Sequence, residues 1–204
     1  MICAIILAAG RSRRMGAQKV LLPFAGRTVI GHIAGEILRS DVDEVIVVAG
    51  PDAPRLAEAL AGRRVTLVAS ADPEGEMLSS VRCGLRALPP ECEAVLVALG
   101  DQPSITAGLV GRMLDAFRVS GRGLVVPVCG GKPGHPILFS ARYRDEVLTR
   151  YDGVGLCGLR QAHPEDVFEL NVTDPSVLVD MDHPEDYRRA LAEFRPGQPT
   201  EAEE

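Results

Sequence analysis

The amino-terminal stretch of the chain reads I-C-A-I-I-L-A-A-G-R-S-R-R-M-G-A-Q-K from Ile2 to Lys19. Its first part, residues 2–9, is a short apolar run, which predicts a buried β-strand covered on both faces. Gly10 ends this run, and a basic segment follows. In an open α/β sheet, ligands bind beyond the carboxyl ends of the strands. The stretch therefore predicts a first strand with a ligand-binding loop directly after it.

Apolar runs of the same kind recur along the chain, and segments with helical spacing separate them. These runs are rich in Val, Ile, Leu and Ala and cover residues 44–49, 65–69, 94–99 and 124–128. Between the run at 2–9 and the run at 44–49, Val29, Ile33 and Ile37 recur every fourth residue, as on the apolar face of a helix. Strands that alternate with helices imply βαβ units and a mainly parallel sheet. We therefore expect an α/β fold.

The alternation is less regular in the last third of the chain. Residues 130–136 form a loop rich in glycine and proline, and a short apolar run at 137–139 follows it. A last helix is expected to begin after His183 and to reach about Phe194. The remaining residues contain Pro, Gly, Thr and Glu without an apolar stripe, which is typical of disorder. We expect one domain over residues 1–194 and a disordered tail over 195–204.

Composition narrows the possible functions. The chain has 204 residues, enough for a sizeable core, and a formal net charge of −6, which argues against broad nucleic-acid binding. Its five cysteines are scattered without a C-x-x-C pair, so neither a zinc knuckle nor a disulfide framework is indicated. No apolar run approaches the roughly 18 residues that cross a bilayer. We expect a cytoplasmic protein with reduced thiols that binds neither nucleic acid nor a membrane.

The first loop combines small residues with cations. Ala8, Ala9 and Gly10 leave room for backbone N–H groups to approach phosphate oxygens. Positive charge comes from Arg11, Arg13, Arg14 and Lys19. A triphosphate needs both aligned donors and cations. The alternative interpretation of this loop is a solvated basic turn without a ligand. The loop is not a P-loop, because the pattern G-x-x-x-x-G-K-[ST] is absent.

Residues 7–19 resemble the L-A-[AG]-G-x-S-x-R-M-G-x-x-K signature of the MobA-like nucleotidyltransferase family at every fixed position. The resemblance implies a Rossmann-like three-layer α/β sandwich with a mostly parallel central sheet. It also implies transfer of a nucleoside monophosphate from an NTP to a phosphorylated acceptor. By position, Arg14 and Lys19 would contact the NTP phosphates as catalytic residues. The implied nucleotide-binding set is Leu7, Ala8, Ala9, Gly10, Arg11, Ser12, Arg14, Lys19, Ser80 and Gly100.

Asp101 follows the apolar run at 94–99, in the sequence G-D-Q-P. A carboxylate at the carboxyl end of a strand is well placed to hold Mg²⁺, which usually takes one or two carboxylates and completes its shell with water and phosphate. The alternative is an aspartate that opens a turn before proline. In the resembled family, the Asp of a G-D-x-P motif binds the metal, which implies that Asp101 is a metal ligand and a catalytic residue.

A second acidic segment contains Asp180 and Asp182, which alternate along an extended stretch and should point to the same side. Family members carry a D-[IVM]-[DN]-x-P-x-D motif at this place. The resemblance implies that its second acidic position, Asp182, is a further Mg²⁺ ligand. The alternative is that Asp182 or His183 caps the helix that begins at Pro184.

Two further segments resemble family elements. Ser80 and Gly84 match the end of a G-M-x-x-S-[LV]-x-x-G stretch, but Glu76 is inserted between its Gly and its Met. Gly134, His135 and Pro136 resemble the acceptor-binding motif of the branch that transfers cytidylyl groups to the molybdenum cofactor. The alternative for a lone loop histidine is a surface or turn residue.

Ala9 agrees with the cytidylyl-transferring branch, because the guanylyl-transferring branch generally has glycine at that position. The branch implies CTP and Mo-molybdopterin as substrates and a molybdoenzyme as a possible recipient of the product. The sequence 152–155 matches the G-D-x-G element of that branch only loosely. Two alternatives stay open: a transferase for another phosphorylated acceptor, and a non-catalytic chaperone that binds nucleotide or cofactor for a molybdoenzyme.

Overall fold

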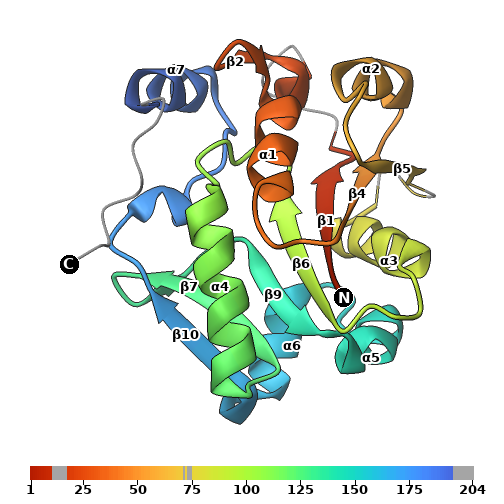
Figure 1. Ribbon diagram of the computed structural model, residues 1–204, viewed down its shortest axis with the longest axis vertical. Helices are drawn as coiled ribbons and strands as arrows, with labels where there is room; N and C mark the ends of the chain where they lie inside the picture. Colours follow the sequence, from red (N-terminus) through yellow and green to blue (C-terminus); the bar gives the residue numbers. More distant parts are fainter. Residues whose placement is uncertain (11–17, 71, 73–74, 195–204) are drawn as a thin grey trace.

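The structure is a computed structural model that describes residues 1–10, 18–70, 72 and 75–194 (Figure 1). The predicted tail lies outside the described residues. A central sheet has the strand order β10-β7-β9-β6-β1-β4-β5, and β8 pairs with β7 at its side. Its strands are β1 (Ile2–Ala8), β4 (Glu44–Ala49), β5 (Thr66–Ala69), β6 (Ala94–Leu99), β7 (Leu124–Cys129), β8 (Lys132–Pro133), β9 (Ile137–Ser140) and β10 (Val167–Asn171). A separate hairpin consists of β2 (Pro23–Phe24) and β3 (Arg27–Thr28).

The strand β1 lies in the interior of the sheet and pairs in parallel with β4 on one side and β6 on the other. All six residues of β6 are buried, and all but one residue of β1 are. Strands covered on both faces cannot show polar alternation, which explains why these segments are continuous apolar runs. The predicted α/β fold with a mostly parallel sheet is confirmed.

Two strands depart from the parallel pattern: β9 lies antiparallel between β6 and β7, and the short β8 pairs antiparallel with β7. The edge strand β10 again runs parallel to β7. The sequence indicated a loss of regular alternation in this region but not where β9 inserts. The apolar residues around Val177 form a short 3₁₀ turn, Pro175–Leu178.

Helices cover both faces of the sheet, which gives three layers (Figure 1). Alternate side chains of β1 belong to different cores: Ala4 and Ile6 to one, and Ile5 to the other. The first core includes residues of α1 (Val29–Leu38), α2 (Ala53–Ala59), α4 (Ala107–Ser120) and α7 (Pro184–Glu193). The second core includes residues of α3 (Met77–Ala87), α5 (Arg144–Thr149) and α6 (Leu156–Ala162). None of the helices described is long and apolar enough to span a membrane.

Two glycines let the end of β1 and the residue after it lie close to the segments that follow β4 and β6. A Cβ atom at Gly50, after β4, would lie 2.6 Å from the carbonyl oxygen of Ala9. A Cβ atom at Gly100, after β6, would lie 2.6 Å from the carbonyl oxygen of Leu7. Real Cβ atoms do not approach backbone so closely, so both positions require glycine. The start of the first loop is therefore enclosed at the carboxyl edge of the parallel strands.

Candidate functional site

A cavity of about 390 Å³ lies at this carboxyl edge, where α/β folds bind their ligands. It is bounded by the end of β1, by the first turn of α3 and by acidic residues that follow β6 and precede α7. Its lining residues are Leu7, Ala8, Ala9, Gly10, Lys19, Val20, Gly75, Met77, Ser80, Leu99, Asp101, Asp180 and Asp182.

Lys19 lies between the two carboxylates for which the sequence predicts a metal-binding role. Its ammonium group forms an ion pair with Asp101 and lies 3.0 Å from Oδ1 of Asp182. The Lys19 and Asp101 side chains are only 14% and 17% exposed, so solvent screens their charges little. Burial by itself would lower the pKa of Lys19, but the two carboxylates outweigh this effect and raise the pKa above its ordinary value.

The acidic segment before α7 is attached to the loop after β6. The backbone N–H of Met181 donates to the carbonyl oxygen of Asp101 over 3.1 Å. Asp180 and Asp182, on either side of Met181, both line the cavity. This agrees with the prediction that the two side chains point to the same side of an extended stretch. Burial raises the pKa of Asp180, and the nearby charges of Asp182 and Asp101 raise it further. The carboxylates therefore repel one another, and Lys19 offsets part of this repulsion.

These donors fit a hard divalent cation that keeps part of its shell for other ligands. The described residues contain no group of three or more His, Cys, Asp or Glu side chains arranged to hold a metal ion by themselves. Mg²⁺, however, usually takes only one or two carboxylates and completes its shell with water and phosphate. Asp101 and Asp182 offer such a pair, and the excess negative charge around Asp180 favours a cation there.

The remaining nucleotide-binding predictions divide into two groups. Leu7, Ala8, Ala9, Gly10 and Ser80 line the cavity together with Lys19, and Gly100 lies against the backbone of Leu7. The predicted phosphate ligands Arg11, Ser12 and Arg14 lie outside the described residues.

The predicted acceptor residues Gly134, His135 and Pro136 are held beside the cavity rather than in its wall. The backbone N–H of His135 donates to the carbonyl oxygen of Val177 over 2.9 Å. A Cβ atom at Gly134 would lie 2.4 Å from the same oxygen, so this contact requires glycine. Burial lowers the pKa of His135, although Asp101 and Asp180 act in the opposite direction. The imidazole is thus within electrostatic reach of the acidic residues.

One contact near the first loop could not be inferred from the sequence. The side-chain amide of Gln18 donates to Oδ2 of Asp52 over 2.8 Å, between residues 34 positions apart. It attaches the residue before Lys19 to the turn that precedes α2. Gln18 is a variable position of the family signature, and no local pattern connects it with Asp52.

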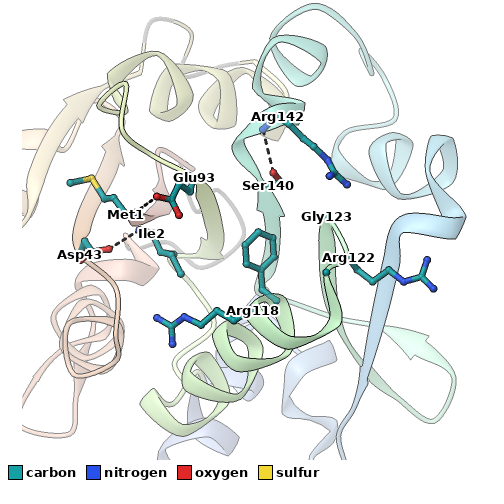
Figure 2. A pocket seen from close by; sticks show the side chains of 11 residues that line it. Met1, Ile2, Asp43, Glu93, Arg118, Arg122, Gly123, Ser140 and Arg142 are labelled. Atoms are coloured by element: carbon teal, nitrogen blue, oxygen red, sulfur yellow. Dashed lines mark hydrogen bonds and ion pairs between the residues drawn. The ribbon is translucent and has the colours of Figure 1, made fainter.

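A second cavity of about 450 Å³ lies at the opposite edge, near the start of β1 (Figure 2). Arg118, Arg122 and Arg142 line it, but Figure 2 shows Arg118 pointing to one side and the other two to the opposite side. Arg142 forms an ion pair with Asp166, and Arg118 pairs with Asp115. Because these cations do not converge, this cavity does not suit a phosphate chain.

Residues 4–167 match the MobA-like NTP transferase domain family. The chain belongs to this family. This MobA-like protein is thus a nucleotidyltransferase by family, and the cavity at the carboxyl edge includes Leu7 to Gly10 and Lys19 of the family signature.

Two curated relatives match this MobA-like protein over nearly its whole length. The molybdenum cofactor cytidylyltransferase of Escherichia coli K12 is 28% identical, and the match covers 95% of this chain and 97% of the relative. The nicotine blue oxidoreductase of Paenarthrobacter nicotinovorans is 29% identical over 93% of this chain and 96% of the relative.

A solved structure with the same fold is that of Rv0371c from Mycobacterium tuberculosis H37Rv. It is 29% identical, covers 94% of this chain and 97% of its own, and superimposes with a TM-score of 0.82. Its complex with manganese superimposes with a TM-score of 0.76 at 28% identity and covers 95% of this chain and 99% of its own.

Proposed function

We propose that this MobA-like protein, with residues 1–194 as a single domain, transfers CMP from CTP to the phosphate of Mo-molybdopterin and releases pyrophosphate. The observation that carries the proposal is that Lys19, Asp101 and Asp182 meet in one cavity that residues 7–10, the start of the signature, also line. The full-length similarity to a molybdenum cofactor cytidylyltransferase supports this choice of substrates. Ala9 and His135 also support it, because both agree with the branch of the family that transfers cytidylyl groups to the molybdenum cofactor.

In the proposed reaction, an acceptor phosphate oxygen attacks the α-phosphorus of CTP. A new P–O bond forms, the bond between the α-phosphorus and its bridging oxygen breaks, and pyrophosphate leaves. Both reactants are anionic, so their approach is opposed by repulsion. Lys19, together with Arg14, offsets this repulsion and stabilises the negative charge that grows on pyrophosphate.

Asp101 and Asp182 are the residues that would hold Mg²⁺. When bound, the ion neutralises charge on the triphosphate and on the leaving group. The ammonium group of Lys19 forms an ion pair with each of these carboxylates and so holds both side chains at the cavity.

No side chain has to act as a strong general base, because a phosphate monoester is already a nucleophile near neutral pH. The chain's main contribution is then to align the acceptor with the α-phosphorus. Such alignment can contribute about 7–11 kcal/mol to lowering the barrier. In the sheet, β6, which precedes Asp101, lies between β1 and β9, so residues 7–10 after β1 and His135 before β9 are suited to hold one substrate each.

The test of this function is pyrophosphate release by the purified protein with Mg²⁺, Mo-molybdopterin and each of CTP, GTP and ATP. We expect release with CTP to be much faster than with the other nucleotides and to stop when EDTA removes the metal. A preference for GTP would contradict the cytidylyl assignment. Release that requires a different phosphorylated acceptor would contradict the assignment of Mo-molybdopterin.

A protein that binds nucleotide but releases no pyrophosphate with any acceptor would instead be a binding protein or chaperone for a molybdoenzyme. A relative named nicotine blue oxidoreductase matches this chain at nearly the same identity and coverage as the cytidylyltransferase, so nucleotidyl transfer has to be measured directly.

A further inference from the structure

The helix α3 begins in the wall of the cavity, where Met77 and Ser80 line it. Glu76 is the residue at the amino-terminal cap of this helix, but its side chain makes no capping bond to the helix. Its Oε2 instead accepts a hydrogen bond of 3.0 Å from the backbone N–H of Gly153. Glu76 is the residue inserted into the family pattern, and Gly153 lies in the segment that matches the family only loosely. The two departures from the family pattern thus contact each other.

A second contact from α3 holds the same loop. Nε of Arg82 donates to the carbonyl oxygen of Val147 over 3.0 Å, and its two Nη atoms donate to Asp152 and to the carbonyl oxygen of Arg150 over 2.6 Å each. These carbonyls lie at the carboxyl end of α5, where a cation is favourable. The Arg82 side chain is only 16% exposed. The hydrogen bond from Arg82 lowers the pKa of Asp152.

The loop 150–155 is also fixed from its other side. Tyr151 has a positive φ of 75°, and its hydroxyl donates to a carboxylate oxygen of Glu146 on α5. Gly153 and Gly155 have φ values of 76° and 62°, which favour glycine. The loop therefore has a defined backbone conformation. The contacts of Glu76 and Arg82 connect it to the first two turns of α3.

The position of α3 indicates which part of a nucleotide its first turn would contact. In the proposed function, the phosphates of the nucleotide bind near Lys19 and Asp101. From there the nucleoside could extend either toward His135 or toward α3. The cavity extends to Met77 and Ser80 of α3, whereas His135 is absent from its lining among the described residues. In addition, α3 packs on β1, β4 and β5, on the side of the first loop away from β9. The first turn of α3 therefore suits the nucleoside.

We propose that Glu76 and Arg82 are positioning residues that hold the first turn of α3 against loop 150–155 and thereby fix the nucleoside-binding wall formed by Met77 and Ser80. This inference rests on the nucleotide binding in the proposed function. It does not depend on the identity of the acceptor.

The test measures binding by calorimetry, with CTP and Mg²⁺ and, separately, with inorganic tripolyphosphate and Mg²⁺. Glu76→Ala should raise the Kd for CTP about three- to tenfold, the effect expected for loss of one hydrogen bond to a charged group near the surface. Glu76→Gln keeps an acceptor oxygen and should restore the affinity. Tripolyphosphate has no nucleoside and should bind equally to all variants. Glu91→Ala, an exposed glutamate beyond the other end of α3, is the matched control.

Amide hydrogen exchange on the free protein tests the contact itself. Exchange at Gly153 should become faster in Glu76→Ala but not in Glu76→Gln or Glu91→Ala. Equal CTP affinity in Glu76→Ala and Glu91→Ala would overturn the inference. If Glu76→Ala weakened the binding of tripolyphosphate as much as the binding of CTP, the assignment of this wall to the nucleoside would be overturned. A wild-type protein that binds CTP but transfers nothing would contradict the proposed function alone; one that binds no nucleotide would contradict both.

Discussion

Lys19 joins residues that lie far apart in the sequence, because its ammonium group contacts Asp101 and also Asp182, which is 163 positions away. An ammonium group close to both carboxylates reduces the cost of gathering negative charge in a partly buried place. It also keeps a cation next to the position proposed for the phosphates. The ion pairs of Lys19 with Asp101 and Asp182 therefore stabilise the two carboxylates, and the same three side chains supply the proposed phosphate and metal contacts.

Asp101→Ala should lower pyrophosphate release by at least about 100-fold, because it removes a proposed metal ligand from the cavity. The fold should stay intact, since Lys19 keeps Asp182 as a partner. Steady-state kinetics and thermal unfolding measure the two effects. Asp115→Ala, on the exposed side of α4, should retain full turnover. Undiminished turnover in Asp101→Ala would contradict the metal-binding role.

His135→Ala should raise the KM for Mo-molybdopterin by about tenfold, the effect of losing one good polar contact to an anionic substrate. The affinity for CTP should stay within about twofold, because His135 does not line the described cavity. Initial rates with each substrate varied in turn separate the two parameters. A rise in the KM for CTP alone would place the histidine on the nucleotide side instead.

At the scale of elements, α3 reaches its position because it packs closely on β1. A Cβ atom at Gly84 would lie 2.6 Å from Cγ2 of Ile5. Gly84→Ala should therefore destabilise the protein by about 1–3 kcal/mol, because the helix must move away from a packed strand. Gly111→Ala is the matched control in α4, where a Cβ atom would have nothing within 4 Å. That change should stabilise the protein by about 0.5–1 kcal/mol.

Urea unfolding at neutral pH measures both variants. Equal stabilities for Gly84→Ala and Gly111→Ala would show that the interface between α3 and β1 can adjust without cost.

At the scale of the whole molecule, Glu146 connects α5 with the loop 150–155 and the end of α6, since it accepts a hydrogen bond from Tyr151 and its Oε2 lies 3.1 Å from Nε2 of His163. The hydrogen bond from Tyr151 is the main cause that lowers the pKa of Glu146 below its ordinary value of 4.5. A lowered carboxyl pKa stabilises the folded state above the ordinary pKa, and this stabilisation is lost as the pH falls through the folded value.

Glu146→Gln should therefore be less stable than the wild type by about 1 kcal/mol at neutral pH, and the difference should narrow as the pH falls below the ordinary carboxyl pKa. Urea unfolding over this pH range measures the difference. Glu58→Gln, an exposed glutamate on α2, should show no such trend. A difference that grows toward acid pH would contradict the sign of the shift.

The sequence by itself determined β1, the alternation of strands and helices, and the choice of Asp101 and Asp182 as candidate site residues. These features follow from local hydrophobic periodicity and from short motifs, which neighbouring residues carry. Only the tertiary structure decided that β9 inserts between β6 and β7, that Lys19 lies between both carboxylates, and that Glu76 contacts Gly153. Contacts between distant residues depend on how whole elements pack, and no local pattern records that packing.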